Sequence, residues 1–186
     1  MLTKEDMYAN SLLSLLVNLK NMRIVYAIFV LLMGNCVFAQ NGIDTTPPYK
    51  RFPTVPPFKI LETDSVSLFT KTDLKKNKPV LIILFSPDCD HCKHETEEII
   101  KHMDDLKKVQ IIMATMMPFA AMKDFYIKYK LEEFKNIKVG QDFQYILPSF
   151  YRVHNLPYLA MYDKKGELLT TFEGTMKIED LINVFK

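Results

Sequence analysis

The sequence FSPDCDHC, residues 85–92, places Cys89 and Cys92 at a junction between two kinds of predicted structure. The apolar run 79–84 before it is typical of a buried strand, and the residues after it follow a helical pattern. The start of a helix offers unpaired N–H groups and a positive dipole end, which favour a thiolate at Cys89. Cys92 lies one helical turn further on, within reach for a disulfide. The pattern therefore predicts a protein that exchanges disulfides.

The helix that begins at the cysteines is predicted to extend to about Lys107. Cys92 falls on its inward, apolar face, whereas Cys89 lies at the exposed helix start. Glu95 lies on the flank of the inward face, where it either complements the helix dipole or transfers protons to the cysteine pair. Its inward position favours the second interpretation. The apolar residues that share this face with Cys92 are Ile99, Met103 and Leu106.

Strand and helix patterns alternate along the rest of the chain. The predicted strands are 58–61, 66–69, 80–85, 109–116, 136–139, 157–163 and 168–173, and the predicted helices after the first are 119–134, 141–151 and 178–185. The first two strands form a hairpin, and the last two form another around Lys164-Lys165-Gly166. This order predicts an α/β fold, with a central mixed sheet flanked by helices and an N-terminal β-hairpin extension.

Residues 1–39 are predicted to be an N-terminal prefix and signal peptide. Arg23 precedes the apolar stretch 24–33, and a small-x-Ala end at Ala39 marks the expected cleavage site. The stretch is shorter than the roughly 20 residues that a membrane span needs. Either Met1 or Met22 is the start, and lipid attachment at Cys36 is a minor alternative. We therefore expect an exported protein, periplasmic or secreted.

The prolines between residues 40 and 57 predict a stiff, extended linker that is unable to join a helix, followed by one domain over 58–186. After cleavage, only Cys89 and Cys92 would remain as a local redox pair. Apolar residues make up 48% of the chain, which is typical of a globular protein. The formal net charge is only +2, and the basic residues are dispersed along the sequence, so nothing indicates a nucleic-acid partner.

The hairpin at 58–69, the run 89–95 (CDHCKHE) and Leu156-Pro157 resemble the TlpA/ResA-like branch of the thioredoxin superfamily, which consists of exported thiol–disulfide oxidoreductases. The resemblance covers nearly all of 58–186 and implies a thioredoxin-like fold. It also implies a monomer without a cofactor. Its partners would be protein disulfides or dithiols and a thiol electron donor, in the membrane or in solution.

The resemblance also implies roles for individual residues. Cys89 would attack the substrate disulfide and Cys92 would resolve the intermediate, with Glu95 as the acidic residue close to both. Pro157 matches the family's cis-proline, which faces the dithiol and leaves the backbone of Leu156 free to pair with a substrate strand.

Three positions depart from the pattern of plain thioredoxin. Ile83 stands where that protein has an acidic residue, Phe85 replaces a tryptophan, and Asp90 replaces the proline between the cysteines. These departures bear on the redox potential and the proton-transfer partner. Protonated His91 would favour a thiolate at Cys89, and Asp90 would oppose it.

Two alternatives from other classes remain. One is a zinc or copper module that uses the two cysteines with His91 or His94, although four ligands from one helix start are awkward for a tetrahedral site. The other is an interaction domain without redox activity. We expect disulfide exchange in the reducing direction, and no metal.

Overall fold

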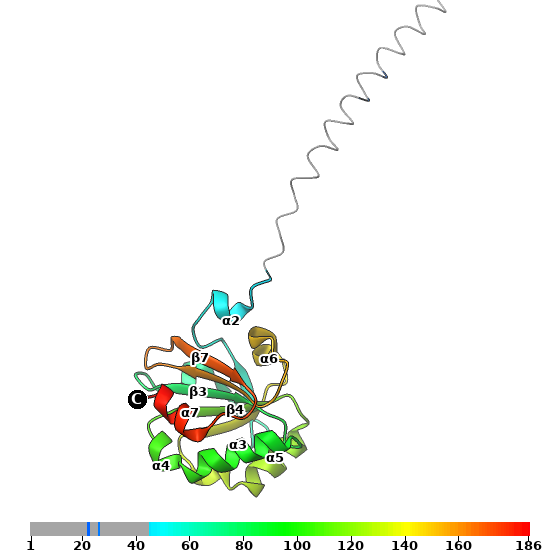
Figure 1. Cartoon of the computed structure of the whole chain (residues 1–186). Helices are drawn as coiled ribbons and strands as arrows, with labels where there is room; N and C mark the ends of the chain where they lie inside the picture. Colours follow the sequence, from blue (N-terminus) through cyan, green and yellow to red (C-terminus); the bar gives the residue numbers. More distant parts are fainter. Residues whose placement is uncertain (1–21, 23–25, 27–44) are drawn as a thin grey trace, which may run out of the picture. The chain divides into compact units, whose positions relative to one another are not determined.

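In the computed structural model, which describes residues 22, 26 and 45–186, the chain folds around a mixed sheet of seven described strands (Figure 1). Their order is β2-β1-β5-β4-β3-β6-β7. β3, β4 and β5 are parallel to one another, and the other pairings are antiparallel. The strands are β1 Lys59–Glu62, β2 Leu68–Thr70, β3 Val80–Leu84, β4 Gln110–Thr115, β5 Ile137–Gln141, β6 Tyr158–Tyr162 and β7 Leu168–Glu173. The predicted mixed sheet is confirmed.

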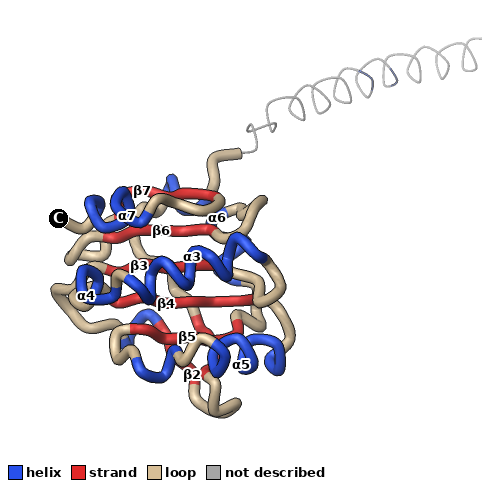
Figure 2. The backbone as a smooth tube through the Cα atoms, turned by 60° about the horizontal axis from the view of Figure 1, so that its bottom comes forward, coloured by secondary structure: helices blue, strands red, loops and turns tan. Residues whose placement is uncertain are grey.

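Helices cover both faces of this sheet. Figure 2 shows α3, α4, α5 and α7 on one face. Residues of α6 pack into the apolar cluster on the other face, and Tyr49 of α2 packs against that cluster. The helices are α2 Pro48–Arg51, α3 Asp90–Lys101, α4 Met103–Leu106, α5 Phe119–Lys128, α6 Ile146–Tyr151 and α7 Ile178–Val184, with 3₁₀ turns η2 Lys71–Asp73 and η3 Leu131–Glu133.

All five residues of β3 are buried, as the continuous apolar run predicts. Leu81 and Ile83 pack into the cluster beneath α3, α5 and α7, whereas Ile82 packs into the opposite cluster beneath α6. Each fully buried aliphatic side chain of this kind contributes about 1.5–3 kcal/mol of transfer free energy. β3 is thus fixed from both faces, and so is the loop that leaves its C-terminal end.

The N-terminal hairpin is confirmed and belongs to the sheet. β1 pairs with β2 through Lys59 and Thr70, and its other edge pairs with β5 through Leu61 and Gln141. The hairpin therefore extends the sheet beyond β5.

Three predicted helices are shorter in the structure than the sequence pattern indicated. The helix expected over 141–151 spans only Ile146–Tyr151, because Gln141 still belongs to β5. The helix expected to reach Lys107 leaves helical geometry at His102, where φ is −107° and ψ is 26°, and α4 follows as a separate turn. The helix expected over 119–134 ends at Lys128, because Lys130 adopts a left-handed φ of 49°. No glycine or proline stands at either break, and the basic residues in the last turns, Lys101 and Lys128, are weak stop signals in a chain with 24 lysines and arginines.

The expectation that residues 40–57 cannot join a helix is wrong for its described part. Pro48 begins α2 at a position where its missing N–H would be unpaired anyway. Val55 is 3% exposed, and its N–H donates to the carbonyl of Gly166 at 3.0 Å. Residues 46–186 form one compact unit.

The predicted signal peptide, the cleavage site after Ala39, the possible start at Met1 and the Cys36 alternative involve residues outside the described ones. Among residues 45–186 and the two isolated described positions, no helix combines the length and the apolar character that crossing a membrane requires.

Gly140 provides a test of how tightly the hairpin joins the sheet. A Cβ at this position would lie 2.8 Å from the carbonyl oxygen of Leu61 and 2.9 Å from Cβ of Ile60. We expect Gly140→Ala to lower the free energy of unfolding by about 1–3 kcal/mol, because backbone must move to admit the methyl group. Urea denaturation measures this change. Lys59→Ala on the exposed side of the same hairpin is the control, and equal effects of the two substitutions would contradict this account.

Candidate active site

Cys89 is held at the point where β3 gives way to α3. Phe85, directly after β3, is buried and packs on Phe125 of α5 with ring centroids 4.7 Å apart. Cys89 is the N-cap of α3, with extended backbone angles of φ −78° and ψ 120°. The packing of Phe85 on one side and the helix start on the other fix the position of Cys89.

The sulfur of Cys89 has two polar contacts. The N–H of Cys92 donates to Sγ of Cys89 at 3.3 Å, in the manner of an N-cap side chain. The thiol of Cys89 donates to the carbonyl oxygen of Leu156 at 3.7 Å. The Leu156–Pro157 peptide bond is cis. The structure thus brings Leu156 and Pro157 to the half-buried Cys89, 67 residues away in sequence.

Cys92 has a different environment from Cys89, although the two residues share one helical turn. Its side chain is 1% exposed and lies in the apolar cluster beneath α3, and both cysteines are free thiols. Burial raises the pKa of the Cys92 thiol to about 12, and the hydrogen bond with Cys89 adds to that increase. Cys92 is therefore a neutral thiol in the folded protein, and it is buried, whereas Cys89 is partly exposed.

Glu95 is buried in the same region, with 2% of its surface exposed. Oε2 accepts a hydrogen bond from the N–H of Met176 at 2.9 Å, whereas Oε1 has no partner among the described residues. Burial raises the pKa of the Glu95 carboxyl to about 7, and the Met176 N–H only partly offsets this effect. The charge of Glu95 is also one of the smaller causes of the raised pKa of Cys92.

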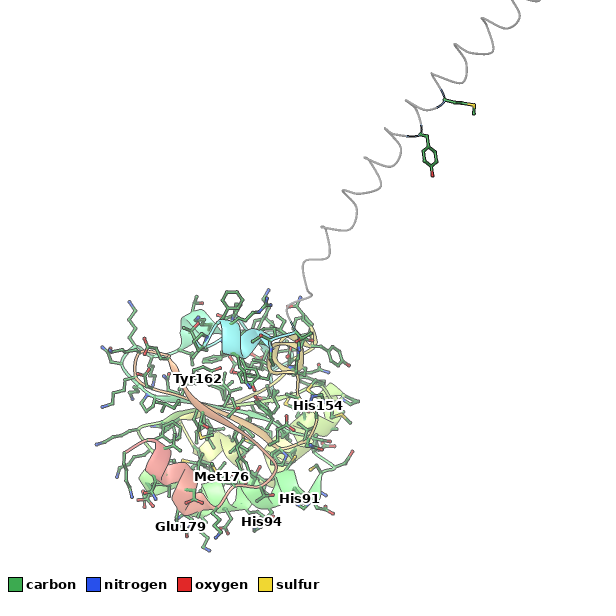
Figure 3. The ribbon with its side chains drawn as sticks, turned by 45° about the horizontal axis from the view of Figure 1, so that its top comes forward. His91, His94, His154, Tyr162, Met176 and Glu179 are labelled. Atoms are coloured by element: carbon green, nitrogen blue, oxygen red, sulfur yellow. The ribbon has the colours of Figure 1, made fainter. Side chains whose placement is uncertain are left out.

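Sequence reasoning did not identify Met176 as a partner of Glu95. Figure 3 shows it on the segment that leads into α7, on the same side of the molecule as His91 and His94 of α3. Met176 contributes its backbone N–H, which every residue except proline possesses, from 81 positions along the chain. No residue type could therefore have signalled this contact.

The two residues between the cysteines, Asp90 and His91, are exposed to solvent. Asp90 forms an ion pair with Lys93 at 2.8 Å. The hydrogen bond from Lys93 and its positive charge lower the pKa of Asp90. His91 is exposed, and no hydrogen bond of its side chain occurs within the described residues. The charge of Asp90 is thus compensated by Lys93, which weakens its predicted opposition to a thiolate at Cys89.

The structure does not favour a metal centre around the cysteine pair. No group of three or more His, Cys, Asp or Glu side chains in the described part of the chain could hold a metal ion. His91 and His94 are both exposed, whereas Cys92 is buried.

Comparison with known families gives a match that covers more than half of the chain. Residues 70–186 match the family model described as a thioredoxin-like domain. No curated protein sequence matches significantly.

Solved structures give further similarities. A putative thioredoxin from Neisseria meningitidis is 24% identical, with a TM-score of 0.59 over 70% of this chain and 86% of that one. A secreted Mycobacterium tuberculosis disulfide oxidoreductase, described as homologous to E. coli DsbE, is 20% identical, with a TM-score of 0.58 over 69% and 93%. The exposed lipoprotein thioredoxin of Streptococcus pneumoniae is 25% identical, with a TM-score of 0.51 over 69% and 98%. These similarities confirm the expected thioredoxin-like fold.

The buried Glu95 makes stability depend on pH. Its pKa is about 7 in the folded state against an ordinary value of 4.5, so the unfolded chain releases this proton first as pH rises. The folded state loses stability between these two values, by about 2 kcal/mol from pH 5 to pH 8. We expect Glu95→Gln to abolish this loss, so that the variant gains on the wild type as pH increases. Urea denaturation of both proteins at pH 5 and at pH 8 measures this change in the free energy of unfolding.

The control for this experiment is Glu132→Gln, which removes an exposed carboxylate. Glu132→Gln should show the same pH dependence of the free energy of unfolding as the wild type. A wild type whose difference from Glu95→Gln stays constant from pH 5 to pH 8 would contradict a raised pKa at Glu95.

Proposed function

The chain belongs to the thioredoxin-like domain family, and on that premise we propose that it is an exported thiol–disulfide oxidoreductase that reduces protein disulfides. Cys89 is the attacking cysteine and Cys92 the resolving one. The observation that carries this proposal is the contrast within one helical turn. Cys89 is half-buried at the helix start with an N–H donated to its sulfur, and Cys92 is fully buried.

The first step is the attack of the Cys89 thiolate on one sulfur of a substrate disulfide. A bond forms between Cys89 and that sulfur, the substrate S–S bond breaks, and the other substrate sulfur leaves as a thiolate. The N–H of Cys92 and the positive end of α3 stabilise negative charge on Sγ of Cys89. This N–H and the helix start both support the assignment of Cys89 as the attacking cysteine.

The second step requires Cys92 to lose its proton. With a pKa of about 12, this thiol does not ionise unaided near neutral pH. Glu95 is the proton acceptor in this proposal, since a carboxyl with a pKa of about 7 is partly ionised there and one of its oxygens is unpartnered. The Cys92 thiolate then attacks Sγ of Cys89, releases the second substrate thiol and leaves a Cys89–Cys92 disulfide.

The substrate segment binds beside Leu156 and Pro157 in this proposal. The carbonyl oxygen of Leu156 lies 3.7 Å from Sγ of Cys89, so an extended peptide that pairs with this backbone would bring its own disulfide to the sulfur. Backbone pairing carries little side-chain specificity, which suits an enzyme that acts on protein disulfides.

Each turnover transfers two electrons to the substrate and oxidises the cysteine pair. A thiol donor, in the membrane or in solution, must therefore reduce the Cys89–Cys92 disulfide again. Export is supported by the predicted signal peptide and by the secreted or exposed proteins among the similar structures.

Replacement of each cysteine tests the assigned roles. Cys89→Ser should lower the rate of insulin reduction with dithiothreitol by about a thousandfold or more, because the nucleophile is lost. Cys92→Ser should instead accumulate a mixed disulfide between Cys89 and the substrate, visible by mass spectrometry. Retained activity in Cys89→Ser would contradict the proposal, as would a mixed disulfide that forms through Cys92 in that variant.

The pH dependence of the second step tests Glu95. The rate of mixed-disulfide resolution in the wild type should rise with pH and level off above about 7, as Glu95 becomes able to accept a proton. Glu95→Gln keeps an oxygen for the Met176 N–H but accepts no proton, so the rate should fall by about a hundredfold and lose its inflection near pH 7. Acid quenching followed by mass spectrometry measures the step. An unchanged inflection in the variant would show that Glu95 has a structural role only.

A further inference from the structure

A lysine-rich surface lies at the end of the sheet remote from the dithiol. A hollow of about 350 Å³ is lined there by six lysines, which we call the basic end: Lys75, Lys78, Lys107, Lys108, Lys135 and Lys138. Two further hollows of about 360 and 350 Å³ continue the surface and add five other lysines. The first two hollows share Lys75 and Lys78. Basic residues that look dispersed in the sequence are therefore gathered at one place in the fold.

Strand direction explains this gathering. Lys78, Lys108 and Lys135 stand just before the N-terminal ends of β3, β4 and β5, which are parallel and adjacent. Cys89 follows the opposite, C-terminal end of β3. A five-residue strand separates the two ends by about 17 Å. In Figure 2 the C-terminus and α4 lie at the basic end of the strands.

Neighbouring acids do little to neutralise the basic end. Among the described ion pairs, only Lys138 of the six has a partner, Glu62 at 2.8 Å. Asp73 is the single acidic residue that lines the first hollow, and its carboxylate accepts hydrogen bonds from the N–H and hydroxyl of Thr70. The residues that line the three hollows carry a formal charge of +9, so the rest of the chain carries −7 of the total of +2.

Two side chains hold the loops of the basic end against the sheet. Gln110 at the start of β4 accepts from the N–H of Lys75 at 2.6 Å and donates to the carbonyl of the same residue at 3.0 Å. Asn136 donates to the carbonyls of Leu106 and Val109 at 3.1 and 3.0 Å. The backbones that carry Lys75, Lys107 and Lys108 are thus tied to strand ends, and the lysine ammonium groups extend from a fixed base.

We propose that the basic end docks this domain on an anionic lipid surface, with lipid phosphate groups at the three hollows and the dithiol directed away from the membrane. A broad row of exposed lysines suits a surface of negative headgroups, because each lysine near such a surface contributes to attraction as a point charge. Stacking of nucleic-acid bases requires several aromatic side chains, and only Phe69 lines the first hollow. The inference is independent of the thiol chemistry.

Vesicle binding of the full chain tests this inference. The basic-end variant is Lys75→Gln/Lys107→Gln/Lys135→Gln, and the matched control Lys59→Gln/Lys123→Gln/Lys128→Gln removes the same charge from exposed positions outside the three hollows. Sedimentation with vesicles of phosphatidylglycerol in phosphatidylcholine measures partitioning. We expect the basic-end variant to lose about a hundredfold and the control less than about fivefold, at low salt. Both variants should keep the far-UV circular dichroism spectrum and the urea midpoint of the wild type, which verifies folding without reference to the thiol chemistry.

Three results would overturn the proposal. One is an equal loss in both variants, which would indicate net charge alone. Another is equal binding to vesicles of pure phosphatidylcholine, which would indicate apolar attachment. The third is wild-type binding to a single-stranded oligonucleotide that is tighter than binding to the anionic vesicles and is lost in the basic-end variant, which would identify a nucleic-acid surface instead.

Discussion

The hydrogen bond from the N–H of Cys92 to Sγ of Cys89 is the contact on which the site depends. It exists because β3 is buried on both faces and delivers the chain to the first turn of α3 in a fixed position. The same turn then directs the Cys92 side chain into the apolar cluster, while Cys89 stays only partly buried at the edge of that cluster. One helix start thereby sets a partly exposed thiol beside a buried one, which is the asymmetry that the proposed two-step exchange needs.

The proposed role of Glu95 sets function against stability in this core. A carboxyl group that is 2% exposed and has one unpartnered oxygen is costly to ionise, and the single hydrogen bond from Met176 only partly offsets that cost. A glutamine at this position would keep the hydrogen bond without the charge. The burial that destabilises the ionised form also brings the pKa of Glu95 to about 7, where a carboxyl both accepts and returns a proton near neutral pH. The presence of a carboxyl at this buried position is therefore easier to explain by the proposed proton transfer than by packing.

The sequence predicted those parts of the structure that follow from local periodicity. The inward position of Cys92 and the buried strand β3 come from spacing alone, and both are confirmed. Contacts made by the backbone at long range could not be predicted, because Met176 offers Glu95 only an N–H. The break of α3 at His102 is marked only by the basic residue Lys101 in the last turn, without the glycine or proline that would have predicted it. The helix that begins at Pro48 was missed because the prolines were interpreted as helix breakers, although the first position of a helix tolerates proline.

The gathering of lysines has a different origin from these local features. Lys78, Lys108 and Lys135 are far apart in sequence, and nothing in their immediate neighbours relates them. They meet because each precedes one of three adjacent parallel strands, and parallel strands begin at the same edge of a sheet. The same topology places the dithiol at the other edge, after the C-terminal end of β3. Strand direction thus places the cysteine pair and the basic end at opposite edges of the sheet. A domain docked on a membrane through its basic end would therefore leave the cysteine pair accessible to substrate.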